Sequence, residues 1–167
     1  IGWMNNPKMF NKEWLNEGAQ IVKDTNAEMC LIIGTNPAAR ATCGKPGGNS
    51  GVIAMTTGGI GGEEADDYFR VMQINKENTV AKFLAEDMPF LIEDSVHNDN
   101  GTDYVIFVPV QAPKNAILKK DLLGVKHLEY IKFAQENWVI PGTNPELCGY
   151  KGITHNISCT VVLGEND

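Results

Sequence analysis

Apolar side chains recur at helical spacing in three stretches of the chain. The first stretch places Trp14, Gly18, Ile21, Val22 and Met29 on one face. Asn11 stands where its side chain can cap the first turn. This pattern predicts an amphipathic helix from Lys12 to about Ala27 or Cys30, with the short apolar run 31–33 outside it.

The other two stretches lie in the middle and near the end of the chain. Val80, Phe83 and Leu84 predict a helix from a cap at Asn75 through Asp87. The clearest stripe consists of Val125, Leu128, Ile131, Ala134 and Trp138. It predicts a helix with His127 on its polar side, ended by the turn residues 141–145.

Four runs are typical of strands: 40–45, 68–74, 104–108 and 157–163. The run 104–108 is apolar at every position up to Pro109, which indicates a strand buried on both faces, as in a parallel sheet. Strands that alternate with helices predict an α/β fold built from parallel crossover units. We find no internal repeat and no domain linker, so we expect residues 1–167 to form a single piece.

Glycine is concentrated in one place. Of the 17 glycines, eight lie between Gly44 and Gly62. Glycine destabilises helices and strands, but it allows tight turns and close approach to a ligand. The eight glycines form two clusters, the first at Cys43–Gly51 and the second at Gly58–Gly62. The first cluster opens a short apolar segment, so its backbone amides can face an anion. We interpret it as a phosphate-binding loop, and a merely flexible surface loop remains the alternative.

The standard nucleotide-binding motifs do not fit this loop. A P-loop requires Gly-Lys-Ser/Thr, but Pro46 follows Gly44-Lys45. A dinucleotide fingerprint requires a third glycine where Glu64 stands. The carboxylates that follow, Glu63, Glu64, Asp66 and Asp67, suggest a solvated turn, since their spacing matches no metal-binding template.

Composition narrows the possible functions. The net charge of −7 argues against non-specific nucleic-acid binding, which needs a basic face. No apolar run approaches the roughly 20 residues that span a membrane, and no signal peptide precedes the first helix. We therefore expect a cytoplasmic protein. The chain begins at Ile1 without a methionine, and we expect a cut or processed chain or a natural fragment.

Four cysteines, Cys30, Cys43, Cys148 and Cys159, lack metal-ligand spacing. We expect them to be small buried apolar residues. No Ser/His/Asp set can be argued from spacing, so no catalytic or metal-binding residue is assigned.

Several segments of the sequence resemble segments of one protein family. They are Ala38–Ser50, Tyr68–Val71, Glu93–Val96, Thr102–Val105, Leu123–Lys126, Asn137–Val139, Gly142–Asn144 and Thr154–Ser158. The first resembles the phosphate-loop segment of ribonucleotide reductase catalytic chains, and the others follow in the family's order. The likeness is greatest to the adenosylcobalamin-dependent class of bacteria and phages, and it extends over nearly the whole chain.

This resemblance implies a fold and a function. The fold would be the C-terminal portion of a ten-stranded α/β barrel. The activity would be reduction of ribonucleoside di- or triphosphates to deoxyribonucleotides by thiyl-radical chemistry, with adenosylcobalamin as the radical source and a thioredoxin-type reductant. The residues matching the family's substrate-phosphate loop are Pro46, Gly47, Gly48, Asn49 and Ser50. The partner would be the complementary N-terminal barrel segment.

The chain departs from the family in two ways. The radical cysteine normally follows Asn-Pro, but here Asn6-Pro7, Asn36-Pro37 and Asn144-Pro145 precede other residues. The radical cysteine and the redox pair therefore have no place in this chain, and we expect the isolated piece to be inactive.

The loop also differs. Gly47 replaces a serine, and Glu64, Asp66 and Asp67 lie where the family has histidine and a Pro-Arg pair. An inactive remnant or a binding module is therefore the alternative function. A separate metal-radical subunit remains an alternative radical source.

Overall fold

The chain contains two compact units. The computed structural model describes residues 1–97 and 100–164. Unit 1 comprises Ile1–Glu64 together with the chain from Pro113 onward, and unit 2 comprises Ala65–Ala112. Among the described residues, no helix is both long and apolar enough to cross a membrane. That residues 1–167 form one piece of a larger barrel domain stays a prediction.

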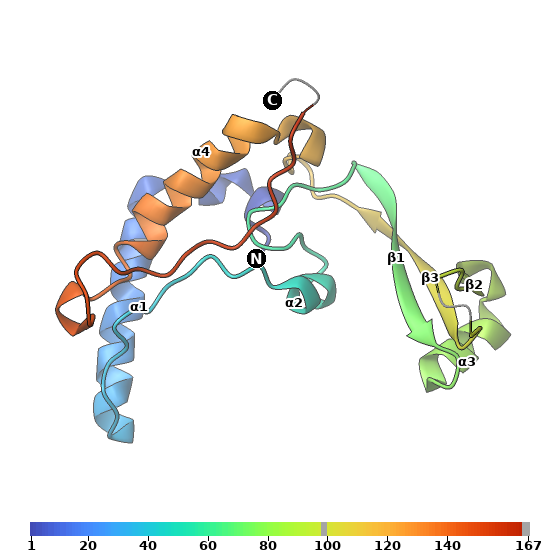
Figure 1. Cartoon of the computed structure of the whole chain (residues 1–167), viewed down its shortest axis with the longest axis horizontal. Coiled ribbons are helices and arrows are strands. Elements are labelled where there is room, and N and C mark those ends of the chain that lie inside the picture. Colours follow the sequence, from blue (N-terminus) through green and yellow to red (C-terminus); the bar gives the residue numbers. More distant parts are fainter. Residues whose placement is uncertain (98–99, 165–167) are drawn as a thin grey trace. The chain divides into compact units, whose positions relative to one another are not determined.

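Helix α1 (Lys12–Ile33) is the longest element of unit 1 and begins where the sequence predicts (Figure 1). The Asn11 side chain accepts a hydrogen bond from the Trp14 amide at 3.0 Å. The helix ends later than predicted, because it continues through the apolar run to Gly34. Gly34 has a φ of 71°, a left-handed conformation that suits glycine and ends helices.

The buried face of α1 differs from the predicted one. Leu15 and Ala19 are buried, whereas Trp14 and Ile21 are 58% and 57% exposed. The helix packs against the π-helix η5 (Gln135–Val139). A Cβ atom on Gly18 would lie 3.4 Å from the Trp138 ring, so small residues let the two helices approach closely. The larger apolar residues consequently remain outside this contact.

Helix α4 (Gly124–Ala134) continues directly into η5. The predicted helix is confirmed, but its predicted stripe is wrong at two positions, because Val125 and Leu128 are exposed. The buried residues of α4 are instead Gly124, His127 and Ala134. The small side chains at the two ends of this face allow the helix to pack closely, and the polar ring between them has a backbone partner.

The core of unit 1 joins segments that are far apart in the sequence. Its fully buried members are Met4, Ile60, Leu122 and Ala134. Aromatic rings extend this cluster, with Phe10 packed edge-on against Tyr130 at a centroid distance of 4.6 Å. The core therefore binds the start of the chain, the second glycine cluster and α4 together.

The predicted strands 40–45 and 157–163 are wrong as regular strands. The two segments meet through one parallel bridge, Gly44 to Ile157, and Leu123 and Val162 form another. Pro46 lacks an amide donor, and the Gly44 backbone lies so close to the Ile157 side chain that a Cβ would be 2.6 Å away. Parallel pairing is thus present in unit 1 as single bridges between segments.

Unit 2 is built on a three-stranded sheet in the order β1-β3-β2. Its strands are β1 (Asp67–Asn75), β2 (Ile92–Asp94) and β3 (Asp103–Gln111). The predicted strands 68–74 and 104–108 are confirmed. All pairing in this sheet is antiparallel, with Val71 opposite Phe107, so the prediction of parallel crossover units is wrong here.

The apolar run of β3 has a simple cause. β3 is the central strand, so the neighbouring residues Val105 and Ile106 are both buried although they face opposite sides. Pro109 lies inside β3 and does not end it. β2 pairs with only 104–106, so at Pro109 the strand has β1 alone as a neighbour and loses few hydrogen bonds.

Helix α3 (Thr79–Asp87) follows β1. Asn78, not Asn75, caps it, with the Asn78 side chain accepting from the Val80 amide at 2.9 Å. Asn75 is the last residue of β1. The described residues are thus α/β, with four α-helices and one small sheet.

The two isoleucines beside the glycine clusters provide a matched test of this core. Ile60 is fully buried and Ile53 is 86% exposed. Ile60→Ala should lower the free energy of unfolding of unit 1 by about 2–5 kcal/mol, whereas Ile53→Ala should change it by less than about 0.5 kcal/mol. All three tryptophans lie in unit 1, so tryptophan fluorescence during urea unfolding measures the difference. Equal effects would contradict the described core.

Candidate functional site

The segment that enters the first glycine cluster is fixed to η5. The Thr42 hydroxyl donates to the Trp138 carbonyl at 2.6 Å, and the Trp138 indole donates to the Cys43 carbonyl at 3.2 Å. A Cβ atom on Gly142 would lie only 1.9 Å from the buried Thr42 hydroxyl. Close packing therefore determines where the loop begins.

The predicted phosphate-binding residues lie at the amino end of the short helix α2 (Gly48–Ile53). The helix thus begins within the first glycine cluster itself. Gly47 is the N-cap residue and has a φ of 57°. Its carbonyl accepts the first helical hydrogen bond, from the Gly51 amide at 2.6 Å.

The first turn of α2 presents amides that precede the first helical hydrogen bond. The amides of Gly48, Asn49 and Ser50 have no acceptor within the helix, as at any helix start. The Ser50 hydroxyl donates to the Gly47 carbonyl at 3.2 Å, while the Asn49 side chain is exposed. This arrangement offers hydrogen-bond donors to an anion. That Pro46, Gly47, Gly48, Asn49 and Ser50 bind phosphate stays a prediction.

Local packing and backbone conformation also require glycine at position 47. A Cβ atom at this position would lie 2.1 Å from Cγ2 of Ile1, and the positive φ also disfavours any other residue. The family's serine does not fit this conformation. The glycine is therefore explained by local packing, quite apart from any ligand.

The second glycine cluster packs backbone against backbone. A Cβ on Gly58 would lie 2.8 Å from the Pro46 carbonyl oxygen. Gly59, with a φ of 51°, passes the carbonyls of Lys45 and Ser158. Glycine is thus required by close contact between the two clusters, which gives the glycine density a structural reason in addition to ligand approach.

His127 holds the second cluster from α4. Its Nε2 atom lies 2.6 Å from the Ile60 carbonyl oxygen, and the ring is 2% exposed. The prediction that His127 lies on the polar side of its helix is therefore wrong. Gly124, His127 and Ala134 share the buried face, and the small residues on either side were the only sequence signal for it.

Asn5 holds the same cluster from the start of the chain. Its Oδ1 atom accepts from the Thr57 amide at 3.0 Å and from the Thr57 hydroxyl at 2.9 Å. Its Nδ2 group donates to the Glu63 carboxylate. Sequence reasoning missed Asn5, because its partners are 52 and 58 residues away and no local pattern marks them.

The predicted solvated turn of carboxylates is only partly right. Glu63 is 1% exposed and is bonded to Asn5, so it is a buried structural residue. Glu64 pairs with Lys119. Asp66 and Asp67 are exposed. Among residues 1–97 and 100–164, no three His, Cys, Asp or Glu side chains gather as a metal site would require.

The four cysteines are free thiols with different surroundings. Cys30 is buried and Cys43 is exposed, and the other two are intermediate. The expectation of four buried cysteines therefore holds only for Cys30. Burial raises the pKa of the Cys159 thiol, which leaves less of the reactive thiolate at neutral pH.

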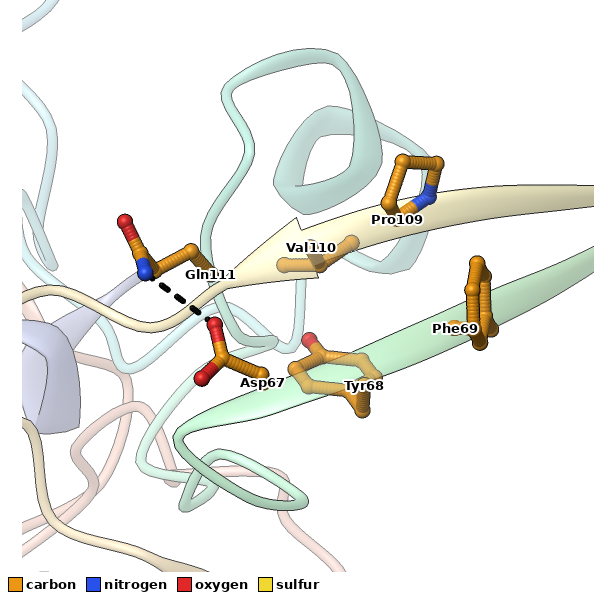
Figure 2. A pocket seen from close by; sticks show the side chains of 6 residues that line it. All are labelled: Asp67, Tyr68, Phe69, Pro109, Val110 and Gln111. Atoms are coloured by element: carbon orange, nitrogen blue, oxygen red, sulfur yellow. Dashed lines mark hydrogen bonds between the residues drawn. The ribbon is translucent and has the colours of Figure 1, made fainter.

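Unit 2 contains a pocket of about 410 Å³ at the end of its sheet. Figure 2 shows its lining residues on β1 and β3, where the Gln111 amide donates to the Asp67 carboxylate at 3.1 Å. The lining residues are Asp67, Tyr68, Phe69, Pro109, Val110 and Gln111. None of the predicted phosphate-binding residues lines this pocket.

Comparison with known proteins gives one informative likeness. No protein-family model matches the chain, and no curated protein matches its sequence. The structure is similar to a crystal structure of a B12-dependent (class II) ribonucleotide reductase, with a TM-score of 0.60. The fold is reductase-like. Sequence identity is 12%, and the match covers 80% of this chain but 18% of the reductase chain, so the likeness concerns the fold of one portion.

Adjacent glycines provide a matched test of the loop geometry. A Cβ on Gly48 would meet nothing within 4 Å, in contrast to Gly47. Gly47→Ala should destabilise unit 1 by at least about 1–2 kcal/mol, the cost of a left-handed non-glycine residue, and shift the amide resonances of α2. Gly48→Ala should be neutral or slightly stabilising, because alanine favours helices. Tryptophan-detected urea unfolding and ¹H–¹⁵N spectra measure both, and equal stability would contradict the geometry at Gly47.

Proposed function

We propose that the chain is part of a ribonucleotide reductase and supplies the loop that binds the phosphates of the substrate. The observation that carries the proposal is the similarity of fold to a class II reductase over 80% of the chain. The ordered sequence segments from Ala38 to Ser158 resemble the same family. Two kinds of likeness, one in structure and one in sequence, therefore favour one assignment.

The loop would bind phosphate through its backbone. The amides at Gly48, Asn49 and Ser50 begin α2, where unpaired donors and the helix dipole favour an anion. Glycine at 47 and 48 leaves no side chain in the way. The exposed Asn49 side chain adds a further donor. The loop has few positively charged side chains, so by itself it would bind phosphate weakly.

Turnover would require residues outside this chain. In the family a cysteine thiyl radical starts removal of the ribose 2′-hydroxyl, and a cysteine pair supplies the electrons. None of the four cysteines follows an Asn-Pro pair, as the radical cysteine of the family does, so none is assigned to these roles. The complementary N-terminal barrel segment would provide them, and a thioredoxin-type reductant would restore the cysteine pair. Such an enzyme would act in the cytoplasm.

Exposed apolar groups favour such a complementary segment. Leu31, Ile32 and Ile33 at the end of α1 are 64–83% exposed. The parallel bridges at Gly44 and Leu123 are single pairs without a continuing ladder. In a ten-stranded barrel, further segments would cover the helix and extend these bridges into strands.

Adenosylcobalamin would be held mostly outside this chain. When bound, the cofactor supplies a radical by cleavage of its cobalt–carbon bond. The pocket of about 410 Å³ falls in the range for a drug-sized ligand, and the cofactor is much larger. This pocket does not fit the cofactor, and we assign no residue of the chain to it. A separate metal-radical subunit is the alternative radical source.

The second candidate function is an inactive remnant that binds a partner without turnover. The exposed carboxylates Asp66 and Asp67 favour it, because in the sequence they stand after the second glycine cluster, where the family has histidine and a Pro-Arg pair. Negative charge repels phosphate. Nucleotide binding separates the two candidates.

A titration tests the phosphate loop directly. The ¹⁵N-labelled chain, mixed with the complementary barrel segment, is titrated with CTP, CDP and cytidine. The two nucleotides should shift the amides of 48–51 with a Kd below about 1 mM, and cytidine, which lacks phosphate, should not. Comparison of CDP with CTP identifies the preferred substrate class. Absence of a phosphate-dependent shift would favour the inactive remnant.

Complementation tests the proposed activity. The chain alone should form no deoxyribonucleotide, because its cysteines lack the radical and redox roles. Addition of the complementary segment, adenosylcobalamin and a dithiol should restore some formation, measured by chromatography of the nucleosides. The segment without the chain is the control. Turnover by the chain alone would refute the division of roles.

A further inference from the structure

The segment Thr57–Glu63, which we term the glycine backstop, lies directly against the predicted phosphate loop. A Cβ on Gly58 would lie 2.8 Å from the Pro46 carbonyl oxygen, and one on Gly59 would lie 3.5 Å from the Lys45 carbonyl oxygen. Contacts of this kind leave little freedom for either backbone. The position of the backstop therefore sets the position at which the loop turns into α2.

Asn5 holds the two ends of the backstop, at Thr57 and Glu63. Ile60 holds its middle through a buried side chain and a buried carbonyl. The Ile60 side chain is fully buried in the core of unit 1. The Ile60 carbonyl lies 2.6 Å from Nε2 of His127, which is itself 2% exposed. A buried carbonyl without a partner is costly, so this contact stabilises one conformation of the backstop.

The contacts of the His127 ring specify which of its two nitrogens carries the proton. An acceptor oxygen at hydrogen-bond distance requires a proton on Nε2. Nδ1 is buried and has no hydrogen-bond partner within the described part of the chain. The ring therefore donates through Nε2 to the Ile60 carbonyl.

We propose that His127 is a positioning residue for the phosphate loop. Its Nε2–H group holds the Ile60 carbonyl, the held backstop supports Pro46, and the support orients the amides at the start of α2 toward a phosphate. The ligand in this statement rests on the proposed function, whereas the link from His127 to the loop does not. The link extends over 67 residues of sequence, and no substrate contact by His127 is involved.

Two substitutions separate a hydrogen-bond role from simple filling of space. His127→Gln keeps an N–H donor at a similar distance along the side chain. His127→Leu fills much of the same volume but leaves the Ile60 carbonyl without a donor. A purely space-filling role would make leucine the better replacement, because it is apolar in an apolar core.

Amide hydrogen exchange reads the link without any ligand. The reporting amides are Gly61, bonded to Gly58 in the backstop, and Gly51 and Ala54, bonded to Gly47 and Ser50 in α2. In His127→Leu these amides should exchange at least about tenfold faster, the effect of losing one buried hydrogen bond. His127→Gln should stay close to wild type. The Lys82 amide of α3, bonded to Asn78 in unit 2, is the control and should not change.

A long-range ¹H–¹⁵N spectrum of the wild-type chain gives a second measurement. This measurement does not depend on whether His127→Leu folds. It should show the His127 proton on Nε2. A proton on Nδ1 would overturn the proposal. Unchanged exchange at Gly51 and Ala54 in a folded leucine variant would also overturn it.

The nucleotide titration distinguishes this inference from the proposed function. If exchange follows the expected pattern but the wild-type chain with its complementary segment binds no nucleotide, the link stands and the reductase role fails. If wild type and both variants bind CTP equally, the reductase loop stands and His127 is not its positioning residue. The proposal expects about tenfold weaker CTP binding for leucine and near wild-type binding for glutamine.

Discussion

Close contact between backbones is the constraint on which unit 1 depends. A Cβ on Gly58 would collide with the Pro46 carbonyl, and one on Gly62 would lie 2.7 Å from the Lys119 amide nitrogen. Backbones this close exclude water, so their polar groups need partners in the protein. The Ile60 carbonyl oxygen is paired with the His127 ring, and the Thr57 amide donates a hydrogen bond to Asn5. The polar side chains in the core thus follow from the glycines around them.

This constraint changes how the glycine-rich stretch is understood. Density of glycine alone does not distinguish ligand approach from backbone packing. Gly58 is explained by packing, and Gly47 by its positive φ and the Ile1 side chain. Gly48 has no neighbour near its missing Cβ, so it is the position at which ligand approach remains the better reason. The phosphate hypothesis therefore concerns the first turn of α2 more than the clusters as a whole.

The sequence predicted elements whose cause is local and missed those whose cause is distant. Asn11 caps α1 through its own first turn, and β-branched and aromatic residues predicted β1. The run 104–108 predicted a strand buried on both faces, but its apolar pattern is the same in the centre of an antiparallel sheet, so strand direction was not encoded locally. His127 was placed on the wrong face because its partner, Ile60, lies 67 residues away. The candidate loop could be proposed from its glycine-rich sequence. Asn5 and His127, which hold the neighbouring glycine cluster, could not be predicted.

The exposed apolar surface of unit 1 gives the strongest physical reason to regard it as part of a larger structure. Burial of one isoleucine or leucine stabilises by about 1.5–3 kcal/mol. Leu31, Ile32 and Ile33 together would therefore add an amount comparable to the roughly 5–15 kcal/mol that holds a domain folded. Covering this end of α1 requires chain segments alongside unit 1, and a reductase barrel would provide such segments.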